Sequence, residues 1–124
     1  METKNQNIKL IECPRDAMQG LHDFIPTEQK INYINQLLKV GFDTIDAGSF
    51  VSPKAIPQMK DSAEVFESID WQSSSSKLLA IVANQRGAAD AVKFLIGNKP
   101  ELDSYMCTKY YKIIVENKPI TLEE

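Results

Sequence analysis

Six consecutive apolar residues, Leu78-Leu79-Ala80-Ile81-Val82-Ala83, decide the class of fold. An unbroken apolar run of this length is typical of a strand buried on both faces of a parallel sheet. Before it, Val65, Phe66 and Ile69 follow helical spacing, and after it residues 88–95 form a helix pattern rich in small side chains. The run therefore predicts a parallel strand between two helices.

Two further strand and helix patterns precede this run. Residues 8–12 are short, β-branched and mostly apolar, as strands are, and residues 42–47, closed by Gly48, are a second strand pattern. Residues 28–40 carry apolar side chains on one helical face. Loops are expected from Cys13 to Pro26 and from Gly48 onward, because proline and glycine follow each strand. Strands alternating with helices favour right-handed crossovers and a parallel sheet, either doubly wound or closed into a barrel.

The pattern changes toward the end of the chain. Glycine and proline interrupt it, and residues 110–116 are a fourth strand-like run with no helix after it. The polar residues 117–124 are expected to be frayed. We therefore divide the chain into residues 1–95, which carry the strand and helix units, and a divergent tail, residues 96–124, of uncertain structure.

The composition is that of a globular domain without a dominant charge. The 124 residues contain 14 Lys and Arg against 17 Asp and Glu, a net charge of −3, and 43% of them are hydrophobic. Mixed charges provide no basic surface for nucleic acid or anionic lipid. No apolar run approaches the roughly 20 residues that span a bilayer, and the polar lead resembles no signal peptide. We expect a cytoplasmic protein in which Cys13 and Cys107 are buried thiols.

The loop after the first strand places Arg15, Asp16 and Gln19 within five positions. A carboxylate binds hard divalent cations, and a guanidinium stabilises an oxyanion while keeping its charge. Taken alone, an adjacent Arg and Asp in a loop are ordinarily a solvated ion pair, so this pattern by itself does not identify a site.

Two segments together are more specific. They are Glu12-Cys13-Pro14-Arg15-Asp16-Ala17-Met18-Gln19 and Ile45-Asp46-Ala47-Gly48-Ser49-Phe50-Val51-Ser52-Pro53-Lys54-Ala55-Ile56-Pro57-Gln58-Met59. They resemble the hydroxymethylglutaryl-CoA lyase family, and the second is close to a signature of that family. The broader group of metal-dependent acyl-CoA lyases and synthases shares mainly the Arg-Asp pair. The resemblance extends from about Ile8 to about Phe94.

The resemblance implies the N-terminal portion of a TIM (β/α)8 barrel, about three to four βα units with a parallel sheet. It implies an enzyme of leucine degradation and ketone-body formation that uses Mg or Mn to cleave 3-hydroxy-3-methylglutaryl-CoA to acetyl-CoA and acetoacetate. Barrel active sites lie at the carboxyl ends of the strands, where both loops fall in the predicted fold.

The resemblance also assigns roles to individual residues. Asp16 is implied as a metal ligand and proton acceptor, and Arg15 as the group that stabilises the enolate oxygen of acetyl-CoA. Gln19 and Ser49 are implied as substrate contacts. Asp46 stands where the family usually has a glutamate that orders the site, so Arg15, Asp16 and Asp46 form the expected catalytic set.

Other groups that the family uses are missing from the sequence. The family completes its metal site with a His-x-His pair and an asparagine, and it supplies an acid from a cysteine in a glycine-rich loop. The single histidine is His22, and Cys107 lies in no such loop. One carboxylate does not retain a divalent metal in water. We therefore expect an incomplete metal site and a chain that is truncated and inactive alone.

The alternative prediction is a non-catalytic fragment or interaction module. A barrel of eight units takes about 250 residues, and an open parallel half-sheet would expose the run from Leu78 to Ala83 at an unpaired edge. Such an edge would pair with a complementary half-barrel or with another copy of the chain.

Overall fold

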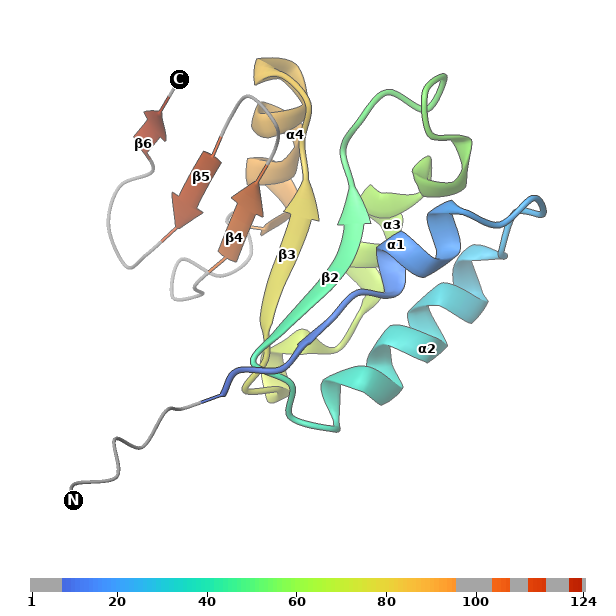
Figure 1. The fold of residues 1–124 in the computed structure, drawn as a ribbon, viewed down its shortest axis with the longest axis vertical. Coiled ribbons are helices and arrows are strands. Elements are labelled where there is room, and N and C mark those ends of the chain that lie inside the picture. The colour runs from blue at the N-terminus through green and yellow to red at the C-terminus, as the bar shows by residue number, and fades with distance from the viewer. Residues whose placement is uncertain (1–7, 96–103, 108–111, 116–120, 124) are drawn as a thin grey trace.

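The computed structural model describes residues 8–95, 104–107, 112–115 and 121–123 (Figure 1). Its elements, in chain order, are β1 (Ile11–Glu12), α1 (Pro14–Gln19), α2 (Thr27–Leu38), β2 (Thr44–Ser49), the 3-10 turn η1 (Pro57–Met59), α3 (Ser62–Ser68), the 3-10 turn η2 (Trp71–Ser73), β3 (Lys77–Ile81), α4 (Gln85–Leu95), β4 (Ser104–Cys107), β5 (Lys112–Val115) and β6 (Thr121–Glu123).

The strands form one sheet in the order β1-β2-β3-β4-β5-β6. β1 to β4 are parallel to one another, whereas β5 pairs antiparallel with β4 and β6 pairs antiparallel with β5. Parallel neighbours joined through helices are the α/β arrangement that the sequence predicts. This part of the prediction is confirmed for the first three strands.

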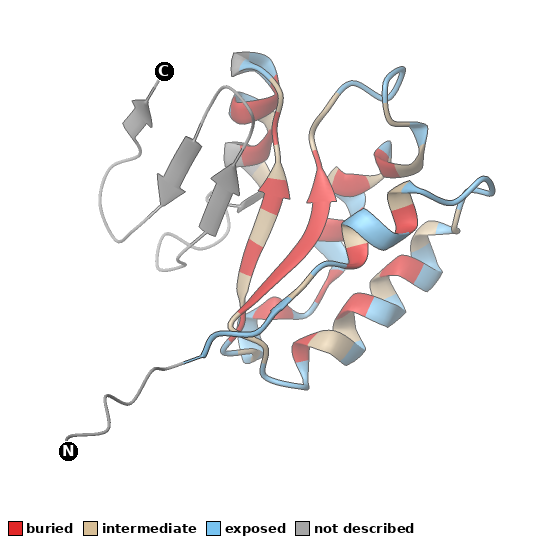
Figure 2. Ribbon diagram, in the orientation of Figure 1, coloured by how far each residue is buried: buried red, intermediate tan, exposed pale blue. Residues whose placement is uncertain are grey.

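The core lies between β2, β3 and the helices that pack on them (Figure 2). Its buried residues, from α2 to α4, are Ile34, Leu38, Ile45, Ala47, Val65, Phe66, Ile69, Trp71, Leu78, Ala80, Val82, Ala88 and Ala91. The predicted helix 28–40 is observed as α2, and Gly41 follows it with a φ of 92°, a conformation that favours glycine.

The apolar run that defines β3 is not buried equally on both sides. Leu78 and Ala80 have no exposed surface, whereas Leu79 and Ile81 are only partly buried. The prediction of a strand buried on both faces is therefore wrong for this structure. The helices cover one face of β3, and the core cluster contains the residues on that face.

The loop predicted from Cys13 to Pro26 contains the short helix α1. Pro14 occupies its first turn, where a missing N–H costs nothing, and Pro14 and Met18 are its buried residues. One buried position per turn is too little to produce a visible periodicity. Cys13 precedes the helix and is exposed, so the prediction of a buried thiol is wrong for this residue.

The tail also departs from the prediction. β4 pairs parallel with β3 and was not predicted, and the expectation that the run from Leu78 to Ala83 forms an unpaired edge is therefore wrong. The strand-like run 110–116 contains β5, which is antiparallel to β4. β6 lies within the segment that was expected to be frayed. The predicted burial of Cys107 lies outside what the structure describes.

Among the described elements, no helix has both the length and the apolar character that crossing a bilayer requires.

Candidate functional site

Arg15 on α1 is joined to Asp46 on β2. Arg15 Nε donates to Asp46 Oδ1 and Oδ2, each at 2.9 Å, and Nη2 donates to Oδ2 at 2.7 Å. Both side chains are largely buried, with 14% and 7% of their surface exposed. Bidentate charged hydrogen bonds of this kind are strong and directional. They fix the guanidinium against the sheet.

The outer side of the same guanidinium faces two further residues of α1. Arg15 Nη1 donates to Gln19 Oε1 at 3.0 Å, because residues four apart share a helix face. Nη1 also lies 4.0 Å from Asp16 Oδ1, whose side chain is 77% exposed. Each Nη nitrogen carries a second N–H beyond these bonds. Arg15 therefore keeps donors for an incoming oxygen atom.

The electrostatics of this cluster keep Arg15 charged and Cys13 protonated. Hydrogen bonding to Asp46 raises the pKa of Arg15. Burial raises the pKa of Asp46, and the hydrogen bonds from Arg15 oppose that rise. Partial desolvation of the sulfur, followed by the nearby charge of Asp46, raises the pKa of Cys13 although the residue is exposed. The thiol is therefore neutral at neutral pH.

Ser49 ends β2 and orders the turn that follows it. Its N–H donates to Ser62 Oγ at 2.9 Å, and its own Oγ accepts from the N–H of Val51 at 3.2 Å. Ser49 also borders a cavity of about 190 Å³ between the segment after β2 and α4. Within the described residues, no hydrogen bond links Ser49 to Arg15. The structure thus unites Arg15, Asp16, Gln19 and Asp46 and leaves Ser49 outside that network.

A divalent metal needs more ligands than these residues supply. The described part of the chain contains no group of three His, Cys, Asp or Glu side chains able to hold an ion. Asp46 is engaged by Arg15, and His22 pairs at 3.0 Å with Asp23, where both side chains are fully exposed. Asp16 remains as one carboxylate ligand, and the described residues by themselves do not fit the metal.

Three residues that are linked by hydrogen bonds beside α1 were given no role from the sequence, although Gln58 lies in the family motif: Lys30, Gln58 and Asp61. Lys30 is buried, and its ammonium group bonds Asp61 Oδ1 at 2.6 Å and the carbonyl of Gln58 at 2.5 Å. A signal was available, because Lys30 precedes the buried Ile34 and Leu38 at four-residue steps on the same face of α2.

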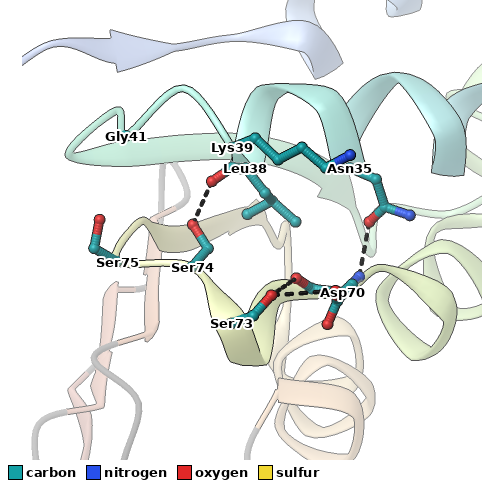
Figure 3. Close-up of a pocket in the computed structure, with 8 residues that line it drawn as sticks. All are labelled: Asn35, Leu38, Lys39, Gly41, Asp70, Ser73, Ser74 and Ser75. Atoms are coloured by element: carbon teal, nitrogen blue, oxygen red, sulfur yellow. Dashed lines mark hydrogen bonds between the residues drawn. The ribbon is translucent and has the colours of Figure 1, made fainter.

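A second cavity, of about 420 Å³, lies at the opposite end of the sheet, beside the amino ends of β2 and β3 (Figure 3). Its polar groups bond one another: Ser74 Oγ donates to the Leu38 carbonyl at 2.7 Å, and the Asp70 N–H donates to Asn35 Oδ1 at 2.7 Å. These bonds close the connection before β3 onto α2. The polar groups that line this cavity therefore have a structural role, and the cavity lies away from Arg15.

The chain is similar in sequence to known acyl-CoA lyases. It is 41% identical over 80 residues to hydroxymethylglutaryl-CoA lyase YngG of Bacillus subtilis, which covers 64% of this chain and 26% of that protein. It is 40% identical over 86 residues to the cytoplasmic 3-hydroxy-3-methylglutaryl-CoA lyase of Rattus norvegicus, covering 68% of this chain and 25% of the relative. No protein-family model matches the chain.

Solved structures agree with these relatives. An HMG-CoA lyase from Acinetobacter baumannii, in complex with coenzyme A and 3-methylmalate, superposes with a TM-score of 0.70 at 40% identity over 76% of this chain and 31% of that chain. The Bacillus subtilis HMG-CoA lyase also gives a TM-score of 0.70, at 34% identity over 82% of this chain and 32% of that chain.

The chain thus spans about a quarter to a third of the length of these relatives. Its strand and helix units are a partial TIM barrel, because the lyases that it superposes on have that fold. Over its N-terminal part, the chain belongs to the hydroxymethylglutaryl-CoA lyase family.

Proposed function

We propose that this chain carries the oxyanion-stabilising part of a carbon–carbon lyase site for 3-hydroxy-3-methylglutaryl-CoA. The observation that supports it best is that Asp46 fixes the guanidinium of Arg15 while the second N–H of each Nη nitrogen remains able to donate. A relative solved with coenzyme A and 3-methylmalate supports an acyl-CoA as the substrate class.

The proposed roles follow from the reaction. When the bond between the tertiary alcohol carbon and the thioester α-carbon breaks, its electron pair becomes an enolate, and the alcohol loses its proton to become a ketone. The second N–H groups of Arg15 donate to the enolate oxygen, and Asp46 holds them in place beforehand, so no reorientation is needed in the transition state. Asp16 accepts the hydroxyl proton, and Gln19 steadies the guanidinium.

We further propose that the chain does not complete this reaction alone. The family resemblance implies a divalent metal, Mg or Mn, which would polarise the substrate oxygens. Among the residues described, Asp16 is the one exposed carboxylate paired with Arg15, and a hard cation needs several oxygen ligands. The remaining ligands would come from another polypeptide or from residues outside the described ranges.

Binding and turnover test this proposal separately. The substrate thioester is titrated into ¹⁵N-labelled chain while the Arg15 Nε–H resonance is followed, and acetoacetate is assayed with Mn²⁺. The backbone amides of Gln19 and Gly20 are followed in the same titration, because they remain observable in the Arg15→Gln variant. We expect a saturable shift of these amides that is lost in Arg15→Gln, provided that the variant keeps its dispersed spectrum, and retained in Lys39→Gln at the far end of the sheet. No acetoacetate above a blank is expected. Absence of binding by the wild-type chain contradicts the proposed function, and turnover contradicts its incompleteness.

The second candidate function is pairing with another chain through β1. β1 is one end strand of the sheet, and Ile8 and Leu10 before it and Ile11 within it are exposed large apolar side chains. An exposed apolar edge strand is a template for pairing with a further strand. Light scattering after size exclusion is expected to show a dimer or larger species that Leu10→Lys reduces to a monomer. A wild-type monomer at high concentration contradicts pairing between copies and leaves a complementary half-barrel as the partner.

We infer a cytosolic location for the chain. The support is one relative named as cytoplasmic, whereas other relatives are named as mitochondrial. Fractionation of the source cells, with the chain recovered in the cytosolic fraction, is the expected result, and recovery in an organelle fraction contradicts it.

A further inference from the structure

The side chain of Gln58 holds the loop that follows α1. Gln58 Nε2 donates to the carbonyl of Leu21 at 2.6 Å and to the carbonyl of His22 at 3.0 Å. These carbonyls lie directly after the helix that carries Arg15, and they are 37 and 36 positions away from Gln58 in the chain. α1 and η1, the turn that contains Gln58, also pack against each other.

The backbone of Gln58 is itself held in place by the buried side chain of Lys30. Its carbonyl accepts from Lys30 Nζ at 2.5 Å, and the same ammonium group bonds Asp61 Oδ1 at 2.6 Å. Only 3% of the Lys30 side chain and 8% of the Asp61 side chain are exposed. Asp61 Oδ2 also accepts from Thr27 Oγ1 at 2.8 Å, so the start of α2 and the start of α3 share one buried network. A buried pair with satisfied hydrogen bonds gives Gln58 a rigid base.

The far end of the same loop is held by a cation–π contact. The ring of Phe24 lies 4.2 Å from Lys30 Nζ and 4.6 Å from Lys60 Nζ. The loop between α1 and α2 is thus fixed by Gln58 near its beginning and by two ammonium groups near its end.

We propose that Gln58 is a positioning residue for the lyase site. By clamping the carbonyls of Leu21 and His22, it holds α1 in the orientation in which Arg15 meets Asp46. An amide suits this task because its nitrogen offers two N–H donors without a charge, whereas a carboxylate in its place offers none. This inference rests on the proposed function of Arg15 and adds a residue that acts through it.

Hydrogen exchange distinguishes a residue that positions α1 from a residue that stabilises the whole fold. Two hydrogen bonds are lost in Gln58→Met, so local opening of α1 should increase about fivefold or more. We expect faster exchange at the Arg15 Nε–H and at the amides of residues 17–21, with unchanged exchange at Ile45 and Leu78 in the core. Gln72→Met, which alters an exposed glutamine on η2, should change neither set.

Two outcomes would overturn the inference: unchanged exchange in α1, or an equal increase in α1 and in the core, which marks Gln58 as a purely structural residue. Gln58→Glu provides the same test with the side-chain length kept, in case Gln58→Met does not fold. The exchange measurement needs no substrate. Failure of thioester binding with a positive exchange result therefore rejects the proposed function and leaves the clamp intact.

Discussion

Arg15 and Asp46, 31 positions apart, are joined by three hydrogen bonds of 2.7–2.9 Å, from Nε to both carboxylate oxygens and from Nη2 to one of them. Asp46 stands where the family usually has a longer glutamate. The short side chain still reaches both nitrogens, because α1 lies against β2. Asp46 therefore makes the contact with Arg15 although its side chain is one methylene shorter than that of a glutamate.

Removing Arg15 should destabilise the fold. Arg15→Met leaves the Asp46 carboxylate buried without its partner, which costs about 3–5 kcal/mol when a buried pair is broken. The double variant Arg15→Met/Asp46→Leu should recover much of that loss, since neither charge remains. Urea unfolding checks both. Asp16→Asn on the same helix is the control and should change little, because its side chain is exposed. An Arg15→Met variant as stable as the wild type contradicts the expectation.

The alkylation rate of Cys13 should report the charges around it. Its raised pKa means a smaller thiolate fraction at a given pH, so iodoacetamide should modify Cys13 more slowly at pH 8 than it modifies an unstructured cysteine peptide. Asp46 raises this pKa and Arg15 lowers it, so Asp46→Asn should speed the reaction and Arg15→Gln should slow it.

The rate is best followed between pH 7 and 10 by mass spectrometry of the peptide that contains Cys13, which separates it from Cys107. The rate should rise with pH as the thiolate forms. A midpoint at or below that of the free peptide would show that the pKa of Cys13 is not raised.

The buried pair of Lys30 and Asp61 should show strong coupling in a double-mutant cycle. Lys30→Met alone leaves Asp61 buried and is expected to cost about 3–5 kcal/mol of unfolding free energy. Lys30→Met combined with Asp61→Leu should cost less than the sum of the two single changes. Lys54→Met, at an exposed lysine, is the matched control. Additive effects would show that the two residues do not interact.

Gly48 should not tolerate a side chain, whereas Gly20 should. A Cβ at Gly48 would lie 2.8 Å from Phe66 Cε2 and 2.9 Å from Ser62 Oγ, both of them on the helix that packs over β2. Gly48→Ala is therefore expected to cost about 1–3 kcal/mol, as overpacked core positions do. At Gly20 the nearest atom is 3.9 Å away and φ is −80°, so Gly20→Ala should be neutral or slightly stabilising. Thermal unfolding of the two variants tests this contrast, and equal midpoints would contradict it.

The pattern of apolar residues along the sequence was sufficient to predict the longer helices and strands of the fold. The helical spacing of apolar residues predicted α2, and the β-branched and apolar runs predicted β2 and β3, with boundaries within two residues for these strands and α2. It failed at α1, whose six residues bury only Pro14 and Met18. After α4 it found the run that contains β5 but missed β4, β6 and the antiparallel pairing. A short helix has too few turns to display a period, and the direction in which a strand pairs depends on its neighbour rather than on its own composition.

The sequence by itself determined the alternation of strands and helices, the family motifs and the identity of Arg15, Asp16, Gln19 and Asp46 as candidates. Tertiary structure decided which distant groups meet: Arg15 with Asp46, and the Ser49 N–H with Ser62 Oγ. It also placed Gln58 against Leu21 and His22. Helix and strand periodicity acts over a few neighbouring residues, whereas hydrogen bonds between segments more than 30 positions apart form only when packing brings those segments together.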